Sequence, residues 1–341
     1  MTGLRFPAGT ATGLGSMPGV DPRESAAIVT GEVGLPYLPE LPERGVGADL
    51  IGRTAGLLTE LPVDYVHRTY RFSASPTAET RRARDYLRWD LDALDERWET
   101  SGFAGEVEIL KIQTAGPYTF AAHVELRGGH KVVRDHGAVR DVIDALAEGV
   151  ATHVAEVERR LGVRVVVQVD EPSIGAVIDG TITPLTRLDP IAPIPVAEVA
   201  EGLTRLATQI GRPLLLHSCA APRWQLIDAL GEAVDGLAVS LDLGTIGERD
   251  FDALGGYLDG GGVLAAGVVP ALDPRVAPDA EELALRVAGL IDRIGLPRRI
   301  LAENLLVTPA CGLAGATTEW TTRALRLSAS TARALVDLAH A

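Results

Sequence analysis

Short apolar, β-branched runs alternate along this chain with longer segments that have helical periodicity. Such alternation is typical of βα units and a parallel sheet. We predict eight strands, at residues 11–16, 34–41, 106–114, 163–171, 212–219, 236–243, 262–269 and 305–311. Eight strands followed by about eight helices favour an α/β fold, a closed (β/α)8 TIM barrel, over an open doubly wound sheet.

The helical segments have recognisable faces and ends. Residues 76–100 carry Leu87, Leu91 and Leu94 at helical spacing, with charged residues between them. Further helices are predicted over 137–161, over 279–294 and from Thr317 or Thr318 onward, and glycine follows the first two directly. Because no linker interrupts this rhythm, we expect residues 1–341 to form a single barrel domain.

Two long segments follow predicted strands on the face where barrels carry their chemistry. Residues 172–195 are rich in proline and poor in charge, which indicates a lid or binding loop. Residues 115–136 contain three histidines and several basic residues. We interpret this second segment as a basic, flexible surface loop.

Composition excludes several classes of protein. The chain has 341 residues, two cysteines and a formal net charge of −14. Two cysteines are too few for a disulfide-rich secreted fold. A protein with this negative charge repels nucleic acid at long range. No signal-peptide pattern begins the sequence, and no uncharged stretch reaches the roughly 18 apolar residues of a membrane span. We therefore expect a cytoplasmic protein with neither nucleic-acid nor membrane partners.

The clearest chemical signal is the pair His217 and Cys219 at the end of a predicted strand. Residues i and i+2 of a strand point to the same face, so both side chains can reach one ion. A buried cysteine beside a hydrogen-bonded core histidine is the alternative. Cys311 ends the eighth predicted strand, and strand ends of a barrel converge on one mouth. One imidazole and two thiolates suit Zn²⁺ and leave a fourth position open.

Two residues of the sixth predicted strand could complete that site. Ser240 and Asp242 alternate on one face of the strand at the same end of the barrel. Asp242 is the better ligand by chemistry, although a capping role at the following turn is equally consistent with its position.

Several motifs occur in an order that resembles the C-terminal catalytic barrel of cobalamin-independent methionine synthase. They are Gly15-Ser16, Gly116-Pro117, Asp170-Glu171-Pro172, His217-Ser218-Cys219 and Pro309-Ala310-Cys311-Gly312-Leu313. The resemblance spans nearly the whole chain, without the family's additional N-terminal domain. It implies a zinc-dependent S-methyltransferase that makes methionine from homocysteine.

The resemblance also implies roles for individual residues. His217, Cys219 and Cys311 match zinc ligands. Leu14, Gly15 and Ser16 match the stretch that binds the amino acid moiety of homocysteine, and Asp170 matches a carboxylate that holds its amino group.

Departures from the family pattern concern the methyl donor and the fourth ligand. The family's fourth zinc ligand is a glutamate, where this chain offers Asp242 or Ser240. His123 stands where a tryptophan stacks on folate, so we place it in the donor subsite, and Ala176 replaces a glutamate that contacts folate. Gly267 replaces the histidine regarded as the proton donor. The donor is therefore left open between a methylated folate and a methylated corrinoid.

Other functions remain open at this point. A related zinc alkyltransferase could act on another thiol. A metal-free decarboxylase-like barrel, resembling the uroporphyrinogen decarboxylases, would make both cysteines incidental. A non-catalytic protein that binds a thiol or zinc is the third alternative.

Overall fold

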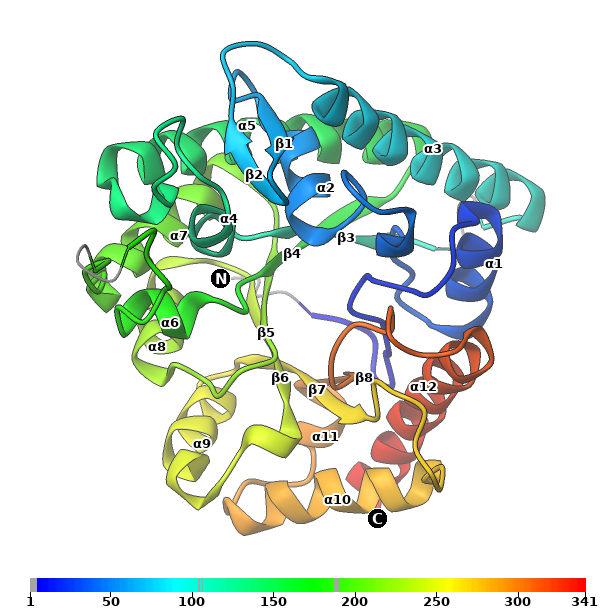
Figure 1. Ribbon diagram of the computed structural model, residues 1–341. Coiled ribbons are helices and arrows are strands. Elements are labelled where there is room, and N and C mark those ends of the chain that lie inside the picture. Colours follow the sequence, from blue (N-terminus) through cyan, green and yellow to red (C-terminus); the bar gives the residue numbers. More distant parts are fainter. Residues whose placement is uncertain (1–4, 104, 106, 187–189) are drawn as a thin grey trace.

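Six parallel strands form the main sheet of the computed structural model, which describes residues 5–103, 105, 107–186 and 190–341. The strands pair in sequence order, so each is added beside its predecessor (Figure 1). They are β3 (Ile109–Ala115), β4 (Arg164–Asp170), β5 (Leu214–Ser218), β6 (Leu237–Asp242), β7 (Val263–Val269) and β8 (Leu305–Pro309). The last six predicted strands are thus confirmed; position 106, where the first of them was predicted to begin, lies outside the described residues.

Two extended segments join the edges of this sheet. The Thr12 N–H donates to the carbonyl of Val307 in β8 (3.1 Å), and Leu35 donates to Ala11 (3.0 Å). Leu38 in turn donates to Lys111 in β3 (3.0 Å), which completes a TIM-barrel-like ring. The predicted strands 11–16 and 34–41 therefore occupy the expected places, but they form isolated bridges. Prolines at 36 and 39 lack the N–H that a continuous ladder needs.

Helices surround the sheet, as Figure 1 shows. Four of them, over Ala78–Ser101, His136–Leu161, Ala280–Arg293 and Thr318–His340, match the predicted helices. Side chains of Thr77, Asp135, Asp279 and Thr317 cap their N-termini. The α-helices are α1 (Pro22–Glu32), α2 (Leu50–Leu57), α3 (Ala78–Ser101), α4 (Pro117–His123), α5 (His136–Leu161), α6 (Ile174–Ile178), α7 (Val196–Ile210), α8 (Trp224–Ala233), α9 (Phe251–Asp259), α10 (Ala280–Arg293), α11 (Ile300–Glu303) and α12 (Thr318–His340). Short 3₁₀ turns are η1 (Pro42–Arg44), η2 (Val132–Arg134), η3 (Leu243–Thr245) and η4 (Glu248–Asp250).

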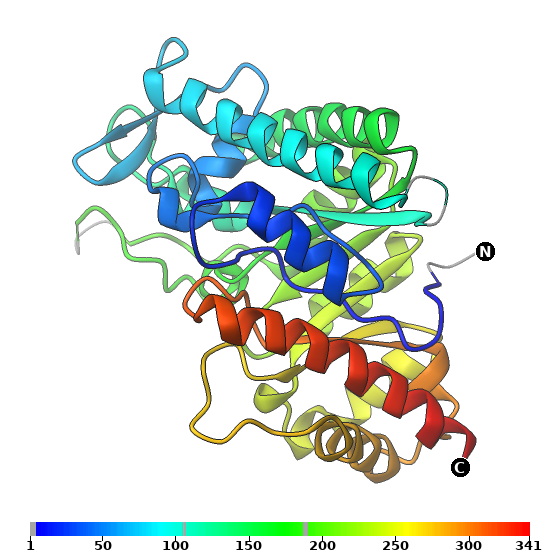
Figure 2. The same cartoon turned by 90° about the vertical axis from the view of Figure 1, so that its right-hand side faces the viewer.

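A small antiparallel hairpin, β1 (Val63–Val66) and β2 (Thr69–Phe72), was not predicted. Figure 2 shows it projecting from the body of the barrel. Its turn residues His67 and Arg68 both have positive φ, 52° and 67°. Such turns usually carry asparagine or glycine, so the sequence gives no signal for this one.

The segment 115–136 differs from the predicted flexible loop. Residues Pro117 to Ala122 of α4 are buried. The Glu171 carboxylate accepts the N–H groups of Tyr118 (3.0 Å) and Thr119 (2.7 Å), which anchors the first turn of the helix to the end of β4. In the other predicted loop, 172–195, the short helix α6 comes first, and residues 187–189 lie outside the described residues.

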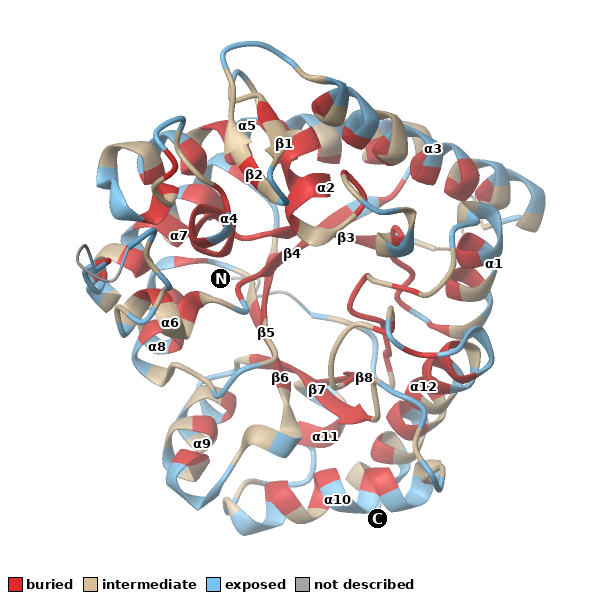
Figure 3. Cartoon of the chain, viewed as in Figure 1, coloured by how far each residue is buried: buried red, intermediate tan, exposed pale blue. Residues whose placement is uncertain are grey.

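The barrel interior changes character along its axis. Near the strand starts, Val166, Leu215, Ala238 and Leu306 pack together. Two residues further along the strands, the same inward positions carry polar side chains, because alternate residues share a face. These polar residues are Gln168, His217, Ser240 and Thr308, all buried (Figure 3 shows the buried strands). The polar layer lies at the end of the barrel where the candidate site is found.

No helix among the described residues is long and apolar enough to cross a membrane.

Candidate metal and substrate site

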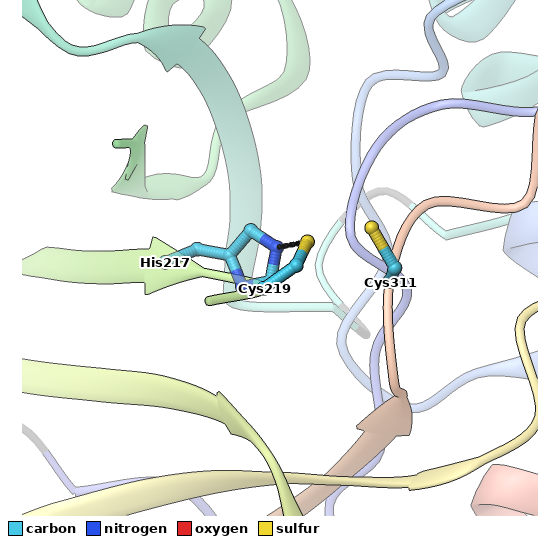
Figure 4. A group of neighbouring side chains, drawn as sticks. All are labelled: His217, Cys219 and Cys311. Carbon is cyan, nitrogen blue, oxygen red and sulfur yellow. Dashed lines mark hydrogen bonds between the residues drawn. The ribbon is translucent and has the colours of Figure 1, made fainter. Parts of the chain in front are cut away.

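Strands β5 and β8 bring His217, Cys219 and Cys311 together (Figure 4). One ligand atom from each residue lies within 4.8 Å of the others, and His217 Nε2 is 3.2 Å from the Sγ of Cys219. His217 is buried, whereas both cysteines are partly exposed. Cys219 and Cys311 are 92 positions apart in the sequence. They meet here because the strand ends of a barrel converge.

This donor set fits zinc. One imidazole nitrogen and two sulfurs are typical zinc ligands, and two thiolates balance the charge of Zn²⁺. Donor atoms around one tetrahedral zinc lie about 3.3–3.8 Å apart, given Zn–N of about 2.0 Å and Zn–S of about 2.3 Å. The observed separations therefore need little adjustment. Three protein ligands leave a position for a substrate atom.

The two thiols affect each other's pKa in opposite directions. The hydrogen bond between the two thiols lowers the pKa of Cys311 and raises the pKa of Cys219. One sulfur of the pair is thus favoured as a thiolate before any cation is bound.

Ser240 and Asp242, the two candidates for a fourth ligand, have other partners. The Ser240 hydroxyl lies 3.1 Å from Nδ1 of His217. The Asp242 carboxylate accepts the Gly244 N–H (2.8 Å) and caps η3. The cluster of neighbouring ligand atoms among the described residues contains His217, Cys219 and Cys311, without Asp242.

The residues expected to hold an amino acid adjoin this cluster. The Gln168 side chain donates to the Leu14 carbonyl (2.9 Å) and to Asp170 Oδ1 (2.7 Å), so it connects both segments. Asp170 is also the register partner of His217. Burial raises the pKa of Asp170, although His217, Gln168 and Lys111 oppose that shift.

Ser16 and Gly15 belong to the same group of residues that are expected to hold the amino acid. The Leu313 N–H donates to the Ser16 carbonyl (2.8 Å), which ties this segment to the loop that carries Cys311. Gly15 has φ 113°, and a Cβ there would lie 2.6 Å from the Gln113 side chain. Only glycine fits both the backbone conformation and the space.

A group of buried charges that was not predicted lies beside Gly15 and Ser16. Lys111 is 0% exposed and donates to Gln113 (3.0 Å), and burial lowers its pKa to about 8. Glu40 lies near it, 3.3 Å from Arg53, which also pairs with Asp90 at 2.6 Å. One Oε of Glu40 has no hydrogen-bond partner in the structure. A lysine and a glutamate inside short apolar runs were the available signal.

Three positions were expected to differ from the family pattern: His123, Ala176 and Gly267. His123 ends α4, where its Nε2 lies 3.0 Å from the Ser173 hydroxyl, and burial lowers its pKa. Ala176 lies in α6. A Cβ on Gly267 would lie 2.8 Å from the Leu241 carbonyl and 3.0 Å from the Ala310 Cα. Main chain therefore fills the space that a side chain at 267 would need.

Comparison with known proteins identifies a family and structures of similar fold. The catalytic-domain family of cobalamin-independent synthases matches residues 8–334. A B12-independent methionine synthase from Shewanella sp. W3-18-1, solved in complex with selenomethionine, aligns over 97% of this chain and 98% of its own, with TM-score 0.62 and 11% identity. A chain from Listeria monocytogenes described as a vitamin-B12-independent methionine synthase aligns over 96% of this chain and 98% of its own, with TM-score 0.47 and 12% identity. Comparison with curated protein sequences gives no match.

Proposed function

The chain belongs to the catalytic-domain family of cobalamin-independent methionine synthases, which are methyltransferases, and from that premise we propose that it transfers a methyl group to the thiol of homocysteine at a zinc site. The observation that carries the proposal is the cluster of His217, Cys219 and Cys311, whose ligand atoms lie within 4.8 Å of one another. Such a cation favours the thiolate form of a bound thiol, because a free thiol of pKa about 8.5 is only a few per cent ionised at pH 7.

His217, Cys219 and Cys311 would hold the zinc. When bound, zinc lowers the pKa of a coordinated thiol, so that the substrate sulfur is available as a nucleophilic thiolate at neutral pH. Free thiols in this arrangement suit a reducing compartment such as the cytoplasm.

The polar residues beside the cluster, Asp170, Gln168 and Ser16, would orient the amino acid. Asp170 would accept hydrogen bonds from the ammonium group, and Gln168 holds that carboxylate in place by its own hydrogen bond. Ser16 and nearby backbone N–H groups would face the substrate carboxylate. Fixed contacts at both ends of the amino acid align the sulfur with the methyl donor.

As an alternative to a methylated folate, we propose a methylated corrinoid as the methyl donor. Departure of a folate nitrogen requires protonation, and a corrinoid leaving group does not. Main-chain atoms fill the space beside Gly267, so no acidic side chain can occupy that position. Turnover with methylcobalamin or a methylated corrinoid protein, and none with methyltetrahydrofolates, is the expected outcome; the reverse preference would contradict it.

Metal analysis tests the zinc site directly. We expect about one zinc per wild-type chain, and loss of zinc in Cys219→Ser and in Cys311→Ser. Ser218→Ala is the matched control. Ser218 lies between His217 and Cys219 in the sequence, and alternation along the strand turns its side chain to the opposite face. Asp242→Asn tests whether Asp242 is a fourth ligand. The substitution would lower zinc affinity if Asp242 binds the metal, and would leave it unchanged if Asp242 only caps the following turn. Zinc-free wild-type protein, purified without chelators, would contradict the proposal.

A further inference from the structure

His217 and Ser240 face each other across two neighbouring strands. They are register partners in the β5–β6 ladder, and His217 Nδ1 lies 3.1 Å from Ser240 Oγ. Both side chains are buried, His217 at 5% and Ser240 at 1% relative exposure. Because sheet register fixes the two backbones, the contact does not depend on a mobile loop.

The two nitrogens of the imidazole have different neighbours. Nδ1 lies beside Ser240, while Nε2 is 3.2 Å from the Sγ of Cys219. A neutral imidazole carries its proton on one nitrogen and a lone pair on the other. Only the tautomer with the proton on Nδ1 leaves the Nε2 lone pair available to a metal beside the cysteines.

We propose that Ser240 is a positioning residue for His217: its hydroxyl accepts the Nδ1–H and thereby directs the Nε2 lone pair toward Cys219 and Cys311. The inference rests on the proposed zinc function. It assigns to Ser240 a role outside the ligand set, since its oxygen is already engaged with the far side of the imidazole. Such partners of metal-bound histidines fix both the tautomer and the orientation of the ring.

The choice of a hydroxyl also sets the charge of the site. Partners of metal-bound histidines are often carboxylates, which add a negative charge behind the ring. Ser240 is neutral, so a neutral imidazole and two thiolates balance Zn²⁺ with no excess. An incoming substrate thiolate then meets a site to which the partner of His217 Nδ1 adds no third negative charge, which favours its binding.

Zinc affinity provides the first test, measured by competition with a chromophoric chelator on the full chain. Ser240→Ala is expected to weaken zinc binding about 10- to 100-fold. Ser240→Thr keeps a hydroxyl and should recover most of that affinity. Ser328→Ala, which removes a buried hydroxyl hydrogen-bonded within α12, is the matched control and should bind zinc as wild type does.

Nitrogen NMR of the metal-free protein provides the second test and does not require zinc. With ¹⁵N-labelled histidine, and His217→Gln to assign the signal, wild type should show the tautomer protonated on Nδ1. Ser240→Ala should shift the population toward Nε2 protonation. Unchanged zinc affinity and an unchanged tautomer in Ser240→Ala would overturn the inference. Failure of wild type to bind zinc would instead overturn the proposed function, so the two failures can be told apart.

Discussion

Gly312 packs directly against Ser16: a Cβ added to Gly312 would lie 2.1 Å from the Ser16 Oγ. The nearest atom is the tip of a small side chain, which can rotate away from an added methyl group. A larger residue at 312 would therefore change the orientation of the Ser16 hydroxyl more than it would disturb the fold. The size of the residue at position 312 therefore limits where the Ser16 hydroxyl can point.

Gly312→Ala is expected to impair substrate binding more than folding. A displaced Ser16 hydroxyl loses about one hydrogen bond to the amino acid, which predicts roughly tenfold weaker binding of homocysteine. The free energy of unfolding should change by less than about 0.5 kcal/mol. Calorimetric titration and urea unfolding measure the two quantities. Equal binding by Gly312→Ala and wild type would remove Ser16 from the substrate site.

Gly267→Ala is expected to destabilise the protein by about 1–3 kcal/mol. The new Cβ would meet the Leu241 carbonyl at 2.8 Å and the Ala310 Cα at 3.0 Å, and main-chain atoms of two neighbouring elements cannot rotate away. Gly289→Ala, in α10 with no heavy atom within 4 Å of the added Cβ, is the control. It should stabilise the helix by up to about 1 kcal/mol. Equal urea midpoints for the two variants would contradict the packing argument.

Asp90→Asn is expected to cost about 3–5 kcal/mol of stability. Asp90 is buried and binds Arg44 through both guanidinium ends (2.7 and 2.8 Å) as well as Arg53 (2.6 Å). A neutral amide leaves two buried guanidinium groups with too little negative charge. The exposed pair of Asp85 and Arg88 provides the control. Asp85→Asn should change stability by no more than about 1 kcal/mol in the same unfolding measurement.

The stability of the protein is expected to depend on pH through Glu40. Burial raises the pKa of Glu40 to about 7, while Arg53 opposes the shift. The unfolded chain ionises this group near pH 4.3, so the wild type loses stability as the pH rises from there to about 7. Glu40→Gln cannot ionise. Its free energy of unfolding should therefore rise relative to wild type, by up to ~3 kcal/mol, between pH 5 and pH 8.

Urea unfolding at several pH values checks the Glu40 prediction. Glu201→Gln, an exposed substitution in α7, is the control and should run parallel to wild type. A Glu40→Gln profile that also runs parallel to wild type would mean that Glu40 is ionised in the folded protein without penalty.

Sequence patterns predicted the strands β3 to β8 because each is a mainly apolar run long enough to be recognised. Segments 11–16 and 34–41 were placed correctly in the barrel, although their prolines and glycines limit them to bridges. The β1–β2 hairpin was missed because His67 and Arg68 adopt positive φ without the residues that usually signal such a turn. Helix α4 was taken for a surface loop because the histidines and basic residues of the whole segment 115–136 masked its buried apolar stretch.

Residue types alone indicated which side chains could bind a metal: a histidine and a cysteine two positions apart, and one further cysteine at a strand end. The tertiary structure decided what these groups have as neighbours. It directs Ser240 to the back of His217, uses Asp242 as a cap, and places Lys111, Glu40 and Asp90 in one buried charge group. The physical reason is that alternation along a strand is local and legible in the sequence, whereas register and barrel closure bring together residues that no local pattern connects.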